Sequence, residues 1–308
     1  MTVYQQINKN KWKSAFLMAI FIAFVLGLGY VLGEYMGGYG YGGVFYAVII
    51  SSFMVLFSYF GGDKVSLFTA GAREVQKKDN PYVWNMVENV AITAGLPMPH
   101  VYIINDPVMN AFATGRNPKH ASIALTAGII ERLENEELEG VIAHELSHIK
   151  NYDTRLMMLV VVLVGAVTLI ADWTFRFHFF GRERRGGGRR EGGQIELIFM
   201  VVGLVLIILS PIIAELIKLA ISRKREYLAD ASAVLLTRYA DGLANALRKI
   251  DAQSHDTMQR ANQATAHLFF ANPFGRKGKF NGVRKLFSTH PPISDRIAAL
   301  EKMSGMSA

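Results

Sequence analysis

Two long apolar runs near the N-terminus limit how this chain can fold more than any other feature. The first covers residues 15–32, and the second covers residues 44–60 and contains no charged side chain. Each run is about as long as a helix that crosses the hydrocarbon core of a bilayer. Because 51% of the 308 residues are hydrophobic, the chain is also more apolar than an ordinary soluble enzyme. A secretory signal peptide would explain the first run alone, but the second run favours a transmembrane hairpin over residues 1–62.

Lysine and arginine are unevenly distributed around this hairpin. The turn between the two runs, residues 33–43, contains neither residue type. Both outer flanks are basic, with Lys9, Lys11 and Lys13 before the hairpin and Lys64, Arg73, Lys77 and Lys78 after it. Positively charged residues remain on the cytoplasmic side of membrane proteins. We therefore expect an integral plasma (inner) membrane protein whose N-terminus, and whose chain after residue 60, lie in the cytoplasm.

Two further apolar runs, residues 156–171 and 195–213, predict a second hydrophobic hairpin over residues 156–221. The loop between them includes residues 181–193, which are rich in glycine and arginine and resemble an RNA-binding tract. Its position between apolar runs favours contact with lipid headgroups, which also accounts for the formal net charge of +8, so no nucleic-acid partner is expected. The loop contains six arginines and its flanks contain six basic residues. The distribution of positive charge therefore does not decide on which side of the membrane this loop lies. The sequence leaves open whether this hairpin spans the bilayer or lies in its interface.

Residues 63–155 and 222–308 have the composition of a soluble domain, and we expect them to form its two parts. In the first part, Asn80-Pro81 begins a helix that ends at Gly95, and a short helix ends near Leu133. Strands are expected over residues 100–106, 110–115 and 121–126, and helices of the second part over residues 223–236, 239–250, 256–270 and 294–303. The expected fold class is an α+β membrane protein that is mostly helical, with two hydrophobic helical hairpins and a small β-sheet.

An H-E-x-x-H motif occupies residues 144–148. Residues four apart on an α-helix lie one above the other, so the imidazoles of His144 and His148 can share one zinc ion. Glu145 is rotated by about 100° from His144, where it can take a proton from a water molecule that the metal activates. Asn135 is the expected N-cap of this helix, and acidic residues follow at the positive end of the helix dipole. A surface pair of histidines is the alternative.

The zinc site needs a third protein ligand, and Glu226 is the best candidate. The chain contains no cysteine, so the ligands must be histidine and carboxylate. Asp230, four residues later on the same helical face, is expected to accept a hydrogen bond from a ligand histidine. The alternative is a surface pair of carboxylates. His148 and Glu226 are separated from their neighbouring apolar runs by similar numbers of residues, so both would lie just off the membrane surface. This favours the interpretation of Glu226 as a zinc ligand.

Together these motifs resemble the HtpX family of membrane-bound zinc metalloproteases, which are related to the CAAX prenyl proteases. The resemblance also includes residues 110–118 (NAFATGRNP) and 288–292 (STHPP), and so covers nearly the whole chain. It implies a zincin-like catalytic domain with one zinc ion per chain. It further implies that Asn110 lies on the strand that pairs with the substrate backbone and that His290 stabilises the oxyanion. Residues 181–193 match no motif of the family.

The expected function is that of a zinc endopeptidase at the cytoplasmic membrane surface, with Glu145 and His290 as catalytic residues. The resemblance implies quality control of misfolded or damaged membrane proteins during stress. Two alternatives are processing of a lipidated or precursor peptide and a membrane metal-binding scaffold without catalysis. The presence of Glu145 argues against the scaffold, since metal binding alone does not need that carboxylate. Whether the chain forms a homo-oligomer is not decided by the sequence.

Overall fold

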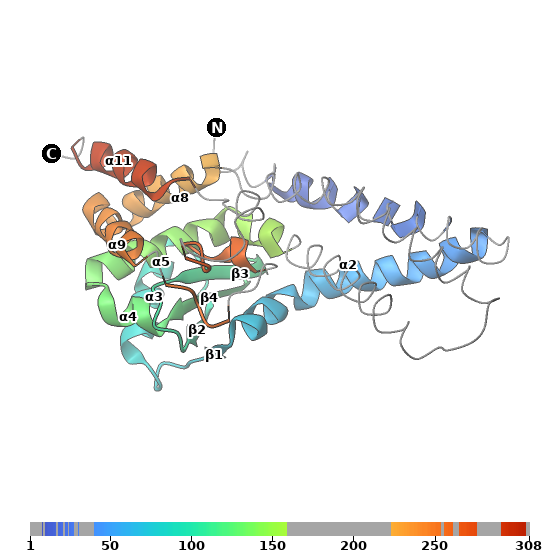
Figure 1. The fold of residues 1–308 in the computed structure, drawn as a ribbon, viewed down its shortest axis with the longest axis horizontal. Coiled ribbons are helices and arrows are strands. Elements are labelled where there is room, and N and C mark those ends of the chain that lie inside the picture. The colour runs from blue at the N-terminus through green and yellow to red at the C-terminus, as the bar shows by residue number, and fades with distance from the viewer. Residues whose placement is uncertain are drawn as a thin grey trace, which may run out of the picture.

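Two long helical stretches extend from a body that consists of a small sheet with helices around it (Figure 1). The structure, a computed structural model, describes residues 40–158, 223–253, 256–260, 265–275 and 291–305, and nearer the N-terminus residues 8, 10–16, 18–20, 22–23, 25–27 and 30. Nearly all of the expected second hairpin, the loop at residues 181–193, and His290 lie outside the described residues.

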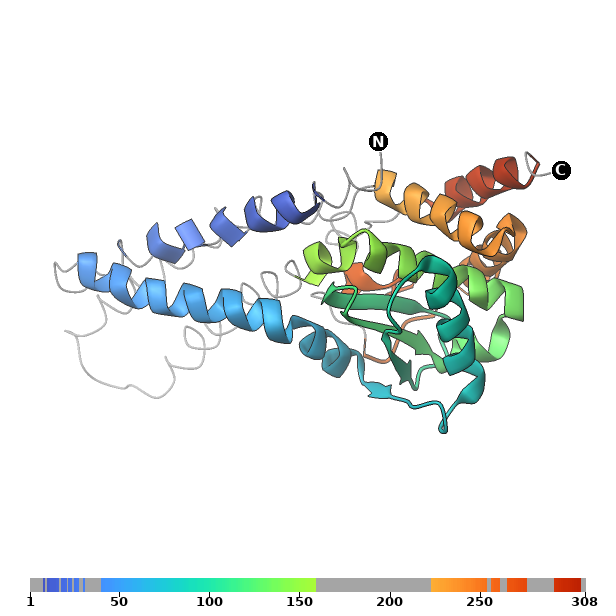
Figure 2. The same cartoon turned by 180° about the vertical axis from the view of Figure 1, so that it is seen from behind.

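The two N-terminal apolar runs are helical where the structure describes them. Residues 10–27 and 44–70 both have the length and hydropathy of a helix that crosses a membrane. The second belongs to α2 (Gly40–Ala70), which continues beyond its expected end at residue 60 (Figure 2). Large apolar side chains remain exposed along α2, with Phe45 at 63% and Phe53 at 68%. Contact of such an apolar surface with water is unfavourable, whereas contact with the hydrocarbon of a bilayer is not, which supports a membrane protein.

The sheet is mixed, with its four strands in the order β1-β2-β4-β3. Its strands are β1 (Ala72–Glu74), β2 (His100–Ile104), β3 (Ala111–Asn117) and β4 (His120–Thr126). β2 and β4 are parallel, and the two edge strands pair with them antiparallel. The side chains of β4 alternate between two hydrophobic clusters, with Ile123 and Leu125 in one and Ala124 in the other. The three expected strands are present with slightly different ends, and the short β1 was not predicted.

The helices of the first part begin and end close to the predicted residues. In α3 (Pro81–Ala94), the Asn80 side chain accepts a hydrogen bond from the Val83 N–H at 3.0 Å, and Gly95 ends the helix with a φ of +67°. The short helix α4 is Ala127–Arg132. The expectation that Asn135 caps α5 (Asn135–Lys150) is wrong, because Glu134 is the N-cap. Its N–H donates to the Glu137 carboxylate at 2.9 Å.

The second part contributes α8 (Arg223–Thr237), α9 (Ala240–Ala252), the short 3₁₀ helix η1 (Ala266–Leu268) and α11 (Ile293–Ser304). The expected helix over residues 256–270 is wrong, because η1 is the only helix among the described residues of that range. Backbone groups there bond distant partners instead. The N–H of Met258 donates to the Pro273 carbonyl at 2.9 Å, and that of Phe270 donates to the Ala111 carbonyl at 2.8 Å.

α5 lies at the centre of the body, in contact with β3, α3, α8 and α9 (Figure 1). Two glycines allow α9 to approach it closely. A Cβ added at Gly140 would lie 3.0 Å from the Leu243 nitrogen, and one added at Gly242 would lie 2.6 Å from the Glu136 carbonyl oxygen. Because glycine has no Cβ, the two backbones can come this close. This packing fixes the helix that carries the H-E-x-x-H motif.

Candidate metal centre

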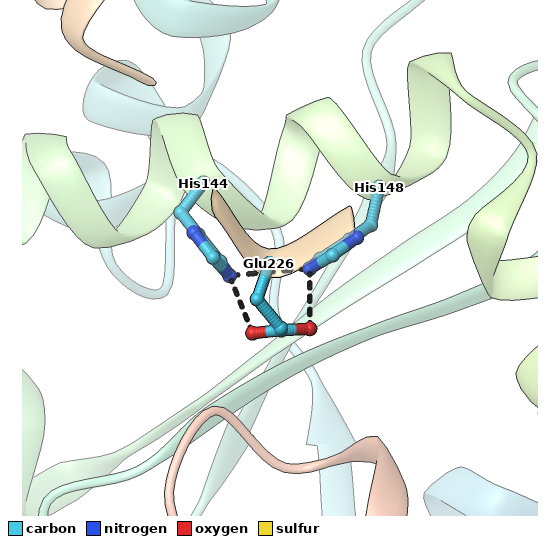
Figure 3. A group of neighbouring side chains, drawn as sticks. All are labelled: His144, His148 and Glu226. Carbon is cyan, nitrogen blue, oxygen red and sulfur yellow. Dashed lines mark hydrogen bonds and ion pairs between the residues drawn. The ribbon is translucent and has the colours of Figure 1, made fainter. Parts of the chain in front are cut away.

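His144 and His148 on α5 and Glu226 on α8 point toward one another (Figure 3). The Nε2 atoms of the two imidazoles are 3.1 Å apart. Nε2 of His144 lies 3.7 Å from one carboxylate oxygen of Glu226, and Nε2 of His148 lies 3.6 Å from the other. All three side chains are buried. Their donor atoms are close enough to bind one metal ion.

The second ring nitrogen of each histidine contacts a carboxylate. Nδ1 of His144 is 2.9 Å from Oδ1 of Asp230 on α8, and Nδ1 of His148 is 3.1 Å from Oδ2 of Asp153, shortly after α5. When each Nδ1–H donates to its carboxylate, both Nε2 lone pairs face the same point. Two nitrogens on one tetrahedral zinc, at about 2.05 Å each, are about 3.3 Å apart. The arrangement of donors therefore fits a zinc ion.

At neutral pH the metal-free His144 ring is neutral and the His148 ring carries one additional proton, because their pKa values are shifted in opposite directions. Burial and the charge of the Arg296 guanidinium lower the pKa of His144 to about 4. Burial lowers the pKa of His148 as well, but the carboxylates of Asp153 and Glu226 outweigh it and raise this pKa to about 9. Because a metal ligand must be deprotonated, a metal ion has to displace this proton.

Arg296, on α11, is fully buried beside the centre and was not predicted. Its guanidinium donates to both carboxylate oxygens of Asp230, from Nε at 2.9 Å and from an Nη atom at 2.6 Å. The same guanidinium lies 4.7 Å from the centre of the Phe270 ring. Burial raises the pKa of Asp230, but the positive charge of Arg296 outweighs it and lowers this pKa to about 2. Arg296 thus keeps Asp230 ionised as a hydrogen-bond acceptor for His144.

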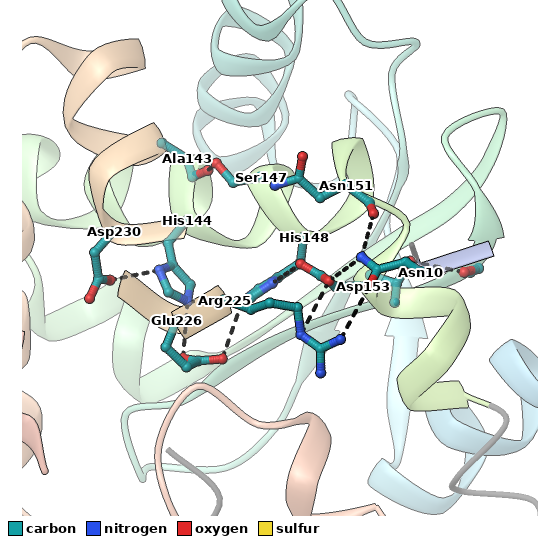
Figure 4. Close-up of polar contacts among 12 residues, drawn as sticks. Asn10, Ala143, His144, Ser147, His148, Asn151, Asp153, Arg225, Glu226 and Asp230 are labelled. Carbon is teal, nitrogen blue, oxygen red and sulfur yellow. Dashed lines mark hydrogen bonds and ion pairs between the residues drawn. The ribbon is translucent and has the colours of Figure 1, made fainter. Parts of the chain in front are cut away.

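Asp153 was not singled out from the sequence, although it lies in the same stretch as the motif. Its Oδ1 is 2.7 Å from Nδ2 of Asn10 and 3.4 Å from Nε of Arg225 (Figure 4). Its position five residues after His148 is a signal that sequence analysis could have used. No such signal exists for Asn10, which is 143 residues away.

Of the three other predicted site residues, the structure describes Glu145 and Asn110. Glu145 is buried on α5, next to His144. The amide of Asn110, directly before β3, binds the backbone of this chain's own Ala271, donating to its carbonyl at 2.8 Å and accepting from its N–H at 3.0 Å. His290 lies outside the described residues. The roles expected for these residues remain predictions.

Comparisons with known proteins identify the family. The model of peptidase family M48 matches residues 77–304. A protein named "Protease HtpX homolog" from Tropheryma whipplei is 43% identical over 301 residues, which is 98% of each chain. A protein of the same name from Lactobacillus acidophilus is 43% identical over 303 residues, 98% of this chain and 100% of that one.

One solved structure shows the same fold. S. mikatae Ste24p has a TM-score of 0.53 and 18% sequence identity, and the match covers 97% of this chain and 67% of that one. The resemblance inferred from the motifs is confirmed by the two HtpX homologues. The family match, the apolar helices and the His-His-Glu group agree with one another, and we conclude that the chain belongs to peptidase family M48, as a membrane metalloprotease.

Proposed function

We propose that the chain is a zinc endopeptidase that cleaves misfolded or damaged membrane proteins on the cytoplasmic side of the inner membrane. The observation that supports this most strongly is the buried convergence of His144, His148 and Glu226. Both histidines present Nε2 to the same point while Nδ1 contacts a carboxylate. Membership of peptidase family M48 makes proteins or peptides the substrate class.

In this proposal the residues of the chain carry out the proton transfers. A zinc ion bound here would polarise the scissile carbonyl and make a water molecule more acidic. Glu145 takes a proton from the attacking water and gives it to the leaving amine. Asp230 and Asp153 hold the rings of the two ligand histidines in the metal-binding orientation.

Substrate alignment and oxyanion stabilisation are assigned to Asn110 and His290. Asn110 directly precedes the edge strand β3, and an extended peptide can add to such an edge. The residue after it, Ala111, already accepts a backbone hydrogen bond from Phe270 on that edge. His290 is six residues before Arg296, whose guanidinium reaches to 3.3 Å from Nδ1 of His144.

We propose that residues 63–155 and 222–308 form one zincin-like catalytic domain. α5 and α8 lie in different parts of the chain and pack against each other at the metal centre. The N-terminal hairpin over residues 1–62 and the hydrophobic stretch over residues 156–221 would hold this domain at the bilayer. The basic flanks of the first hairpin support a cytoplasmic position.

The variant Glu145→Gln tests the catalytic part of this proposal. The full chain in detergent micelles should cleave an unfolded membrane protein, and the variant should be slower by about 10²-fold or more, because it lacks the general base. Glu136→Gln, which changes an exposed carboxylate on the same helix, is the matched control and should cleave normally. Cleavage by Glu145→Gln at the rate of the unchanged chain would contradict the assignment.

The substrate class is tested by comparing membranes from cells with the unchanged chain and with Glu145→Gln. New peptide ends that need Glu145 should lie in cytoplasmic segments of many damaged membrane proteins. A single lipidated or precursor peptide as the only substrate would favour a processing protease instead. A zinc-loaded chain that cleaves none of these substrates would favour a metal-binding scaffold.

A further inference from the structure

The first apolar helix reaches the turn that follows the zinc-ligand helix. Asn10 is 3% exposed, and its amide nitrogen donates to the Asn151 carbonyl at 2.9 Å and to Oδ1 of Asp153 at 2.7 Å (Figure 4). The amide oxygen accepts a hydrogen bond from an Nη atom of Arg225 on α8 at 3.3 Å. A single side chain of this helix therefore contacts the ends of both ligand-bearing segments.

A second contact fastens the same helix to the same turn. The ammonium group of Lys11 lies 4.8 Å from the centre of the Tyr152 ring, a cation–π distance. Tyr152 has a φ of +60°, which is uncommon for a residue other than glycine. The turn between α5 and Asp153 thus has a defined conformation, and two neighbouring residues of the first helix contact it.

Asp153 links this contact to the metal centre. Its Oδ2 atom is 3.1 Å from Nδ1 of the ligand His148, while its Oδ1 atom is the acceptor for Asn10. Nε of Arg225 is 3.4 Å from the same Oδ1 atom. Asp153 is 1% exposed, so water cannot replace these partners at low cost. The position of Oδ1 decides where Oδ2 lies, and Oδ2 in turn orients the imidazole.

We propose that Asn10 is a positioning residue of the metal centre, which holds the His148 ring in its metal-binding orientation through Asp153. The inference rests on the proposed zinc site and adds the first apolar helix to it. Carboxylates that orient metal-bound histidines are worth about 10-fold to 100-fold in metal affinity. The attachment of the first helix to the body and the retention of the metal are then linked.

Metal release measures this link directly. We would load the full chain with zinc in detergent micelles and follow transfer of zinc to a coloured chelator. Asn10→Ala should lose zinc about tenfold faster than the unchanged chain, because a buried charge-assisted hydrogen bond to Asp153 is absent. The visible spectrum of the cobalt-loaded variant should also change, since the ligand geometry around the metal is altered.

A double-mutant cycle shows whether Asn10 acts through Asp153. Asp153→Ala alone should speed zinc release by about 10-fold or more. Adding Asn10→Ala to Asp153→Ala should then have no further effect, because the carboxylate that Asn10 holds is gone. A purely structural role of Asn10 would instead add its full effect in both backgrounds.

Two control variants separate positioning from general damage to the helix. Ser14→Ala removes a hydroxyl that donates to the Asn10 carbonyl of its own helix at 2.9 Å, and the variant should release zinc at the unchanged rate. Lys11→Ala removes the contact with Tyr152 but none with Asp153 and should have a smaller effect than Asn10→Ala. Melting curves should show that all variants are folded.

The proposal is overturned if folded Asn10→Ala has the zinc release rate and the cobalt spectrum of the unchanged chain. It is also overturned if the effects of Asn10→Ala and Asp153→Ala are additive. In either case the unchanged chain still binds zinc, so the proposed metal site would stand. An unchanged chain that binds no zinc would instead remove the site itself.

Discussion

Two buried guanidinium groups lie beside the two carboxylates that contact His144 and His148. Arg296 pairs with Asp230, and Arg225 lies 3.4 Å from Asp153. One oxygen of Asp230 contacts Nδ1 of His144, and one oxygen of Asp153 contacts Nδ1 of His148. An isolated buried charge would be costly, so Arg296 makes it possible for Asp230 to stay ionised inside the body, and Arg225 places a positive charge beside Asp153. The charges of the centre are therefore set by residues that do not bind the metal.

Arg296→Ala should destabilise the protein strongly, because it leaves the Asp230 carboxylate buried without its cation. Breaking a buried pair in this way costs about 3–5 kcal/mol of unfolding free energy. The matched control is Arg248→Ala, which breaks an exposed ion pair between α9 and Glu301 of α11 and should cost less than about 1 kcal/mol. Denaturant melts of both variants measure the difference. If Arg296→Ala lowered the unfolding free energy no more than Arg248→Ala does, the Arg296–Asp230 pair would not be important for stability.

Zinc affinity should fall as the pH is lowered. The metal-free pair binds one proton with a pKa of about 9 on His148, while the pKa of His144 is about 4. Below pH 9, zinc must displace that proton, so its apparent affinity should fall by about tenfold per pH unit between about pH 5 and pH 8. Competition with a zinc indicator across this range measures the slope. A flat profile would show that His148 is already deprotonated in the metal-free protein.

Short-range signals predicted most of the helices and strands, and the largest error occurred where long-range contacts decide the structure. Asn80-Pro81 and Gly95 mark the ends of α3 because their caps involve only neighbouring residues. The failure over residues 256–270 has a tertiary cause. Gln259 donates its backbone N–H to Asp106 at 2.8 Å, and Met258 and Phe269 pack on the face of the sheet away from α5. No local pattern contains those partners.

Gly242→Ala tests the close packing of α9 on α5. The added Cβ would lie 2.6 Å from the Glu136 carbonyl oxygen, so one of the two helices has to move. Such overpacking costs about 1–3 kcal/mol. Gly305→Ala is the matched control, because the nearest contact that its Cβ would make with the described residues is the Glu301 carbonyl oxygen at 3.7 Å. Melting temperatures should fall for the first variant and remain near the original value for the second. A fully stable Gly242→Ala would contradict the close approach of the two helices.

The metal centre draws its residues from distant parts of the chain. The convergence of His144, His148 and Glu226 was predictable because each motif occupies one helical face. Arg296 is 66 residues from Asp230, and Asn10 is 143 residues from Asp153, so no spacing rule connects them. Sequence patterns thus predict the residues that would bind the metal, whereas the residues that orient them depend on how the chain is folded.

The orientation of the whole molecule in the membrane is tested by cysteine labelling, which is straightforward because the chain contains no cysteine. Single cysteines at Tyr39 and Lys77 lie on opposite sides of the expected bilayer. An impermeant thiol reagent added to intact cells should label position 39 and not position 77, since the basic flanks favour the cytoplasm. Permeabilised cells, in which both should react, are the control. Labelling at 77 alone would invert the proposed topology.

The zinc content of the purified full chain tests the central claim most directly. The unchanged chain should hold about one zinc ion, because two histidines and one carboxylate complete a zinc site with water. His148→Ala and Glu226→Ala should each lose most of that zinc, while Glu145→Gln, which changes no ligand, should keep it. Full zinc occupancy in folded Glu226→Ala, or no zinc in the unchanged chain, would contradict the assignment of this site.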